Sequence, residues 1–328
     1  MNYRTVREVA VADKVVLLRL DLNVPVDAAG KIISDFRVRC ALPTLNYLVE
    51  RRAKVVVLSH LGRVKTKEDL KTKSLRPVAD CLRQLLPATK VSFVNDIEGQ
   101  NLEAAIAQLN PGQVLVMENT RLADVVSITG HFDVTQQRES GNSEQLGRYW
   151  ASLGQVFVND AFAMAHRAHA SNAGIARFIA EACVGLLVVR ETTHLQRLVD
   201  SPPAPYVAFV GGAKVSDKIK LLKRLLAQAH KVVIGGAMAF TFLRAQNVAV
   251  GKSPVEDDQV PLVKEYLQRF ADKIVLPCDF VTNHSVTASN APVVTANAVI
   301  AADMMGLDVG AQSLAAYRRL VATAKTIF

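Results

Sequence analysis

The chain has 328 residues, of which 50% are hydrophobic and 21% are charged. This composition excludes a disordered or fibrous chain, and the length suits two domains because single cores stop growing at about 250 to 300 residues. The 39 Lys and Arg residues outnumber the 30 Asp and Glu residues, so we expect an anionic small-molecule ligand. A nucleic-acid partner is disfavoured because the basic residues form no block with interleaved aromatic residues for base stacking.

No targeting or membrane-spanning segment is predicted. Residues 1–13 mix charged and apolar side chains and lack the unbroken apolar core of a secretory signal. The most apolar later stretch, Ala173–Val189, is interrupted by Arg177 and Glu181, which favours an amphipathic helix over a membrane span. Four cysteines lie far apart without CxxC pairs, so free thiols in a reducing compartment are expected. We therefore expect a cytoplasmic protein with no membrane partner.

Short aliphatic runs recur through the first half of the chain, each followed by a polar or glycine-bearing loop and then a helical pattern. They are Val15–Leu20, Val55–Leu58, Val91–Val94, Val114–Met117 and Val156–Val158. The alternation predicts βαβ units and a parallel sheet that is covered on both faces. Residues 123–143 are polar and lack clear periodicity, so they are interpreted as a surface excursion.

The same pattern restarts in the second half of the chain. Its expected strands are Tyr206–Val210, Lys231–Ile234, Lys273–Leu276 and Val299–Ala301. Between the two sets lies a helical pattern that is closed by Pro202, Pro203 and Pro205. The predicted fold class is therefore α/β, with two doubly wound parallel-sheet, Rossmann-like lobes. The expected boundaries are a first lobe at 1–172, an interdomain helix and hinge at 173–204, and a second lobe at 205–328.

Basic side chains follow four of the first-lobe strands. Because ligands of open parallel sheets bind beyond the carboxyl ends of the strands, these residues should meet at one edge. Arginine's rigid fork suits phosphate and carboxylate oxygens, so the cluster predicts a polyanionic ligand. A single arginine in such a loop is usually a solvated charge, but coincidence at four strand ends is a weaker explanation. For His166 and His169, packed and functional roles remain equally open.

A small-residue turn opens the second lobe. Gly211, Gly212, Ala213 and Lys214 directly follow an expected strand, and a helix pattern begins after them. Small residues let backbone N–H groups approach an anion at a helix N-terminus, and Lys214 and Lys218 remain available for phosphates. The segment is not a P-loop or a GxGxxG fingerprint. Alone it is a weak signal, since tight strand-to-helix packing would also require small residues.

Longer strings of this sequence resemble the motifs of the phosphoglycerate kinase family, in order and at similar spacing. They are LLRLDLNVPV, SHLGR, MENTR, NDAFAMAHRAHAS, FVGGAKVSDKIKLL, IGGAMAFTFL and MGLDVG. The resemblance covers nearly the whole chain. It implies a glycolytic phosphotransferase that moves a phosphoryl group between 1,3-bisphosphoglycerate and ADP, with 3-phosphoglycerate and ATP as the other pair.

The resemblance also implies roles for individual residues. Arg37 is assigned to the migrating phosphoryl group, because charge on its equatorial oxygens needs a fixed cation, and Lys214 is its counterpart in the second lobe. The residues implied to hold phosphoglycerate are Asp21, Asn23, Arg37, His60, Arg63, Arg121 and Arg167. The residues implied to contact ADP or ATP, bound with Mg²⁺, are Gly212, Ala213, Lys214, Lys218, Gly235, Gly236, Gly306 and Leu307.

The sequence departs from the family pattern at several positions, among them Ala163, Met164, Leu122 and Ala311, and also at its end. Ala237 stands where the family usually has a third glycine, and its methyl group can close a backbone approach. The family also continues past the end of this chain with a glycine-rich loop whose carboxylate helps to hold Mg²⁺. We therefore expect a second lobe that is incomplete, no metal ligand within the chain, and reduced activity of the chain itself. The alternative function is a truncated relative that only binds phosphoglycerate; a monomer is expected in either case.

Overall fold

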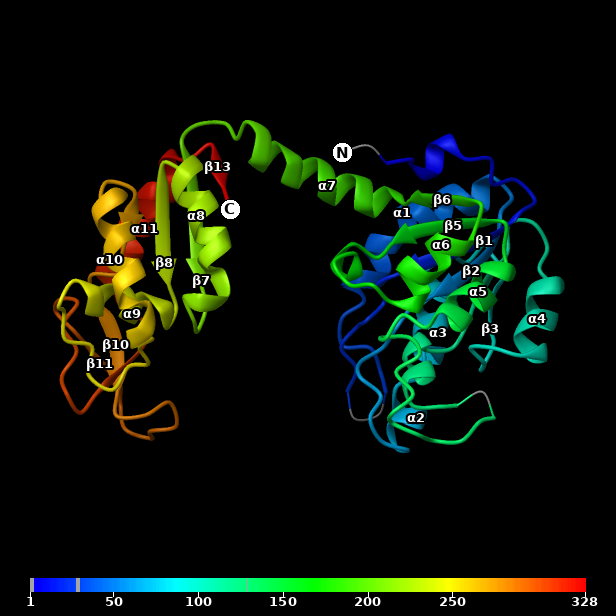
Figure 1. The fold of residues 1–328 in the computed structure, drawn as a ribbon, viewed down its shortest axis with the longest axis horizontal. Helices are drawn as coiled ribbons and strands as arrows, with labels where there is room; N and C mark the ends of the chain where they lie inside the picture. Colours follow the sequence, from blue (N-terminus) through cyan, green and yellow to red (C-terminus); the bar gives the residue numbers. More distant parts are fainter. Residues whose placement is uncertain (1–2, 28–29, 128) are drawn as a thin grey trace. The chain divides into compact units, whose positions relative to one another are not determined.

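The computed structural model describes residues 3–27, 30–127 and 129–328. The chain divides into two compact units, residues 1–196 and 197–328. The boundary falls within helix α7 (Leu186–Asp200), through which the chain passes from one unit to the other (Figure 1). Each unit has its own sheets and its own hydrophobic cores.

The first unit is built on a parallel sheet. In the described part of the chain this sheet has six strands in the order β3-β4-β2-β1-β5-β6. They are β1 (Val15–Leu20), β2 (Lys54–Leu58), β3 (Val91–Phe93), β4 (Val114–Val116), β5 (Val156–Asp160) and β6 (Glu181–Val184). Strands β2, β4 and β3 extend from one side of β1, whereas β5 and β6 lie on its other side. The order therefore reverses beside β1, and such a switch point is where open α/β sheets bind ligands.

Helices cover both faces of this sheet. They are α1 (Phe36–Glu50), α2 (Asp69–Thr72), α3 (Arg76–Leu85), α4 (Gln100–Ala107), α5 (Glu144–Ser152) and α6 (Ile175–Phe178), with short turns η1 (Val6–Glu8), η2 (Thr120–Asp124), η3 (Phe162–Met164) and η4 (Ala170–Gly174). Successive strand residues point to opposite faces. Leu18 accordingly packs in one core with Leu45 of α1, whereas Leu17 packs in the other with Trp150 of α5. The predicted two-sided parallel sheet is confirmed.

The segment expected to be a helical connector contains a strand. Within Ala173–Val189 the chain forms η4, α6 and then β6, which pairs in parallel with β5. The helical prediction was wrong for Glu181–Val184, because a strand of four residues cannot be distinguished from a helix segment by periodicity alone. The long helix of the connector, α7, begins only at Leu186.

The second unit combines two sheets. A parallel sheet has the order β13-β7-β8-β9 and an antiparallel sheet the order β11-β10-β12. The strands are β7 (Tyr206–Gly211), β8 (Lys231–Gly235), β9 (Ile274–Val275), β10 (Phe280–Asn283), β11 (Val293–Val294), β12 (Met305–Val309) and β13 (Thr326–Ile327). The helices are α8 (Ile219–Gln228), α9 (Met238–Ala245), α10 (Val260–Arg269) and α11 (Ala311–Thr323), with turns η5 (Ser216–Lys218) and η6 (Asp257–Gln259). Figure 1 shows α8 beside β7.

One expected strand of the second unit is absent from the described residues. Val299–Ala301 forms only a single bridge, between Ile300 and Val250. Ile300 is buried against Phe240 and Phe280, whereas Val299 is exposed. A short apolar run can therefore be satisfied by the packing of one side chain without pairing as a strand. The antiparallel sheet that lies next to this run had no counterpart in the sequence-based expectation.

Candidate active site

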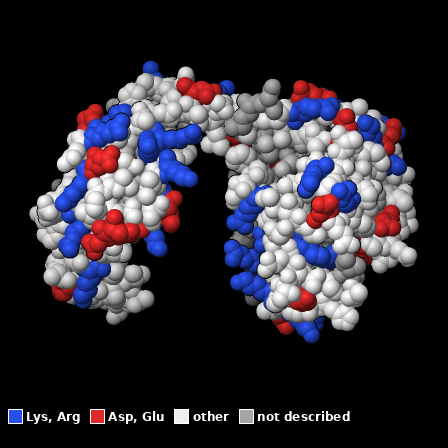
Figure 2. Space-filling view, viewed as in Figure 1, with Lys and Arg blue, Asp and Glu red and all other residues white. Residues whose placement is uncertain are grey.

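Basic side chains converge at the carboxyl edge of the first sheet. Arg37 lies in the first turn of α1, His60 and Arg63 follow β2, Arg121 lies in η2 after β4, and Arg167 follows β5. Electrostatic interactions join Arg121 to Arg63 and Arg167, and join His60 to Arg37 and Arg121. Figure 2 shows Lys and Arg side chains gathered along one side of this unit. The fold thus brings together the basic residues that the sequence predicted at separate strand ends.

Two polar residues after β1 hold the loops of this edge. Asp21 forms an ion pair with Arg37, and its side chain is only 8% exposed. Asn23 accepts a hydrogen bond from the Gly62 backbone N–H through its Oδ1, over a distance of 2.7 Å. Asn23 therefore anchors the loop that carries Arg63. Asp21 holds Arg37, whose own side chain remains 45% exposed.

Three of the arginines form no ion pair with a carboxylate in the part of the chain that the structure describes. They are Arg63, Arg121 and Arg167. Arg121 is partly buried and its Nε has no hydrogen-bond partner. Burial lowers the pKa of Arg121, the nearby charges of Asp124 and Glu139 raise it, and those of Arg167 and Arg63 lower it, although a guanidinium stays charged. A hollow of about 560 Å³ lies beside Arg63 and Arg121. Because buried donors without partners are rare, the unpaired Nε of Arg121 suits an anion bound there.

His60 is the buried uncharged donor of the cluster. It is 4% exposed. Burial, followed by the nearby charges of Arg19 and Arg121, lowers the pKa of His60 to about 2. The imidazole is therefore neutral at physiological pH and presents one N–H and one acceptor nitrogen.

The two histidines whose roles were left open lie in different environments. His166 is exposed and accepts a hydrogen bond from Arg167 Nε over 3.1 Å. His169 is buried, and its Nδ1 lies 3.6 Å from Glu139 Oε1 without forming a hydrogen bond. His169 thus lies in the interior beside Glu139, whereas His166 lies on the surface beside Arg167.

Two buried charged residues were missed by the sequence reasoning. Arg19 of β1 is 1% exposed, and its Nε donates to Ser171 Oγ over 2.8 Å. An arginine inside an otherwise aliphatic strand was the signal that could have revealed it. Glu139 is 0% exposed, although it lies in the segment 123–143 that was interpreted as a surface excursion. That interpretation was wrong for this end of the segment, because hydrogen bonds to Ser171 draw Glu139 into the interior.

In the second unit, two strand-to-helix turns pack backbone against backbone. Gly236 follows β8 with φ +62°, and a Cβ added there would lie 2.9 Å from both N and O of Gly212. The Met238 backbone N–H donates to Gly212 O over 3.0 Å. Only a residue without a side chain fits this position, both for its conformation and for the close approach. Gly212 and Gly236 are thereby held together at the carboxyl ends of β7 and β8.

The helix start after β7 already holds a carboxylate. Glu256 accepts hydrogen bonds from the Val215 N–H at 2.5 Å, the Ser216 N–H at 3.2 Å and the Ser216 hydroxyl at 2.6 Å. Burial raises the pKa of Glu256, but these hydrogen bonds outweigh it and the net pKa is lowered. The sequence predicted that backbone N–H groups at this helix start would face a ligand anion. In the structure the Glu256 carboxylate accepts hydrogen bonds from two of these groups instead. Lys214 is exposed, and the Lys218 side chain lies against Gly212.

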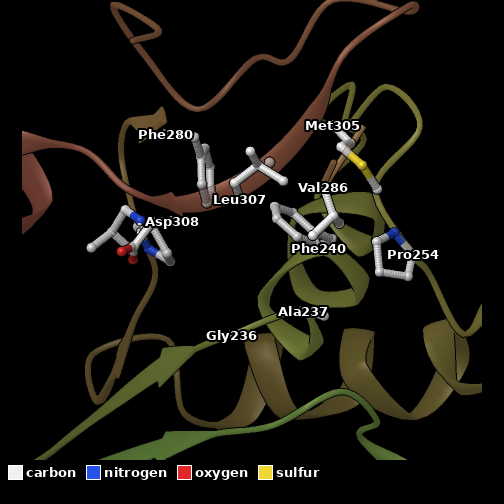
Figure 3. A pocket seen from close by; sticks show the side chains of 12 residues that line it. Gly236, Ala237, Phe240, Pro254, Phe280, Val286, Met305, Leu307 and Asp308 are labelled. Atoms are coloured by element: carbon white, nitrogen blue, oxygen red, sulfur yellow. Dashed lines mark hydrogen bonds between the residues drawn. The ribbon is translucent and has the colours of Figure 1, made fainter. Parts of the chain in front are cut away.

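An apolar pocket of about 350 Å³ lies beyond the second of these turns. Figure 3 shows Phe240 of α9, Phe280 of β10 and Leu307 of β12 around it. Of the predicted nucleotide residues, Gly236, Gly306 and Leu307 line this pocket, whereas Gly235, Gly212, Ala213 and the two lysines do not. Ala237 also lines it, with an ordinary helical φ of −63°, so its backbone does not require glycine. Apolar walls with few polar groups suit a planar base.

A cluster of arginines at the sheet edge of one α/β unit, together with a lysine-bearing turn and an apolar pocket on another, is typical of an enzyme that transfers phosphoryl groups. The family model for phosphoglycerate kinase matches residues 6–328. The chain belongs to the phosphoglycerate kinase family.

Individual relatives agree with this assignment. The phosphoglycerate kinase of Spiroplasma citri is 44% identical over 99% of this chain and 80% of its own length. That of Listeria monocytogenes serotype 4a is 46% identical over 100% of this chain and 80% of its own length. The solved structure of phosphoglycerate kinase from Coxiella burnetii superposes with a TM-score of 0.79 at 35% identity, over 99% of this chain and 79% of that one. The enzyme from Pyrococcus horikoshii OT3 gives a TM-score of 0.80 at 30% identity.

These matches bear on the expected activity. The family match runs over residues 6–328, and the chain spans about 80% of the length of the curated relatives it matches. Membership of the family supports the phosphotransfer function.

Proposed function

We propose that this chain catalyses the glycolytic phosphotransfer of its family, between 1,3-bisphosphoglycerate and ADP on one side and 3-phosphoglycerate and ATP on the other. Membership of the family supports the reaction. The observation that carries the assignment of the site is the convergence of Arg37, His60, Arg63, Arg121 and Arg167 at one sheet edge. Three of these arginines form no ion pair with a carboxylate among the described residues. A phosphate and a carboxylate on one small molecule match this charge.

The first unit then binds the phosphoglycerate. Arg63, Arg121 and Arg167 neutralise its phosphate, because their guanidinium forks match phosphate oxygens and form no ion pair with a carboxylate of the described residues. His60 donates an uncharged N–H to the ligand. Asn23 and Asp21 hold the loop of Arg63 and the side chain of Arg37, respectively. In this assignment Asp21 and Asn23 act mainly by fixing basic groups in place.

Arg37 and Lys214 are the catalytic residues of the proposal. In the direction of ATP consumption, a carboxylate oxygen of 3-phosphoglycerate forms a bond to the γ-phosphorus as the bond to the ADP oxygen breaks. The carboxylate is already ionised at neutral pH, so no general base is needed. Catalysis therefore consists of positioning and of cations that stabilise charge on the equatorial oxygens of the moving group.

The second unit binds the nucleotide. The apolar pocket takes the base against Gly236, Gly306 and Leu307, and the segment Gly212 to Lys218 lies on the phosphate side. Because Glu256 occupies the backbone N–H groups at this helix start, the ammonium groups of Lys214 and Lys218 carry the phosphate contacts.

Magnesium is implied by the family as the companion of ADP or ATP. The residues that the structure describes include no group of three or more His, Cys, Asp or Glu that could hold a metal. They do not form a metal site of their own, so we assign no ligand to Mg²⁺ and derive no step from it. An ion that arrives on the nucleotide phosphates would neutralise their charge.

A cytoplasmic monomer is part of the proposal. No helix in the described ranges is long and apolar enough to cross a bilayer. The four cysteines are free thiols in the structure, as expected in a reducing compartment.

The test of the proposal is a coupled assay with 3-phosphoglycerate and ATP, combined with calorimetry of 3-phosphoglycerate binding. Arg37→Ala should lower kcat by about 10³ or more, as expected for an arginine that neutralises a transferring phosphoryl group. Arg39→Ala is the matched control, because Arg39 lies in the same helix and pairs with Asp35 on its exposed surface. A loss below about tenfold for Arg37→Ala, or no detectable 3-phosphoglycerate binding by the parent chain, would overturn the proposed roles.

A further inference from the structure

A buried chain of hydrogen bonds lies behind the anion site. Glu139 and Ser171 are both fully buried. Ser171 donates twice to the Glu139 carboxylate, from its backbone N–H at 2.9 Å and from its hydroxyl at 2.5 Å. The same hydroxyl oxygen accepts from Arg19 Nε at 2.8 Å. The Ser171 hydroxyl therefore links the two charged side chains: it donates its proton to Glu139 and accepts a hydrogen bond from Arg19.

The chain continues from Arg19 to His60. Arg19 NH2 lies 3.3 Å from His60 Nδ1, and another guanidinium nitrogen donates to the Leu20 carbonyl. A guanidinium has donors only, so His60 Nδ1 must be the acceptor. In a neutral imidazole the single proton then sits on Nε2. Arg19 thus fixes His60 as the tautomer that carries its proton on Nε2 and can donate from that nitrogen.

A negative charge is needed to keep Arg19 at this depth. An isolated buried guanidinium is unfavourable, and the neighbouring Arg121 repels it. Glu139 is the largest attractive charge on Arg19, followed by Asp21. Asp21 is already paired with Arg37. Glu139 is therefore the acidic group that balances the buried Arg19, and it comes from a segment that contributes no predicted ligand contact.

We propose that Glu139 is a positioning residue of the phosphoglycerate site, which acts through Ser171 and Arg19 to hold His60 with its Nε2–H available to the anionic ligand. The inference rests on the proposed function of this site and extends it to residues that do not touch the substrate. Loss of the Glu139 charge frees Arg19 to move toward other carboxylates, and His60 then loses its fixed tautomer. The effect should appear in the binding of phosphoglycerate and not in the binding of nucleotide.

Kinetics of Glu139→Gln, Ser171→Ala and Glu98→Gln test the proposal. The first two should raise KM for 3-phosphoglycerate by about tenfold or more, as expected when a hydrogen bond to an anion is lost, while KM for ATP stays unchanged. Glu98→Gln is the control for stability, because Glu98 forms a two-bond ion pair with Arg138, the neighbour of Glu139, but contacts no member of the chain. It should lower the melting temperature without changing either KM.

Nitrogen NMR of ¹⁵N-histidine-labelled protein supplies the second readout, with the His60 signals assigned by their loss in His60→Gln. The parent should show a protonated Nε2 and an unprotonated Nδ1, and Glu139→Gln should show exchange between tautomers. A protonated Nδ1 in the parent, or an unchanged KM for 3-phosphoglycerate in Glu139→Gln, would overturn the inference. If the parent does not bind 3-phosphoglycerate at all, the proposed function fails, whereas the NMR signals still report on the buried chain.

Discussion

Removal of His60 should change how the stability of this protein depends on pH. His60 is buried beside Arg19 and Arg121, and burial together with these charges lowers its pKa from 6.5 to about 2. In the unfolded chain the same imidazole is exposed and recovers its ordinary pKa. The unfolded state therefore takes up a proton below pH 6.5 that the folded state does not accept until about pH 2.

The sign and size of the effect follow from this difference. Between pH 6.5 and about pH 2 the unfolded state binds more protons, so the unfolding free energy falls as the pH is lowered. The loss approaches about 1.4 kcal/mol per pH unit well below pH 6.5. Between pH 7 and pH 5 the contribution of this one histidine amounts to about 2 kcal/mol. Above pH 7 the contribution changes by only about 0.2 kcal/mol.

Urea unfolding at pH 7 and pH 5 measures this contribution. The parent should lose about 2 kcal/mol more between the two pH values than His60→Gln, whose side chain does not titrate. His194→Gln is the matched control, because His194 is an exposed residue of α7 and should behave like the parent. Equal losses in the parent and in His60→Gln would refute the buried neutral state of His60, whatever the absolute stability of the variant.

Three further predictions concern the second unit. Gly236→Ala should lower the free energy of unfolding, measured in urea, by about 1 to 3 kcal/mol. Gly235→Ala is the control and should change stability little, because no atom lies within 4 Å of the added Cβ. Equal effects of the two substitutions would contradict the close approach of Gly236 to Gly212. Glu256→Ala should reduce stability by about 1 to 2 kcal/mol through loss of its hydrogen bonds to the helix start, and Asp257→Ala, an exposed neighbour, should not. Lys218→Ala should raise KM for ATP about tenfold or more with KM for 3-phosphoglycerate unchanged; parallel rises in both would argue against a phosphate contact.

Much of the first unit could be predicted from local sequence. The strand β1 was predicted with the bounds that the structure shows, and β2 to β5 within two residues, because aliphatic runs between glycine- or proline-bearing loops leave few alternatives. The meeting of Arg37, His60, Arg63, Arg121 and Arg167 followed from the same pattern. Parallel strands end at a common edge, so residues just beyond them become neighbours wherever the strands lie in the sheet.

Other features depended on partners distant in the sequence. Strand β6 forms because β5 offers it an edge, and Ile300 packs without becoming a strand because Phe240 and Phe280 surround it. Glu139 and Glu256 look like ordinary surface acids in the sequence. In the structure Glu139 is buried against Ser171, and Glu256 accepts hydrogen bonds at the start of a helix about 40 residues earlier in the chain. Local composition determined which segments form strands and which residues lie at their ends. Only the packed tertiary structure decided which charges are buried and which donors they satisfy, because burial and hydrogen bonding depend on groups brought together from separate parts of the chain.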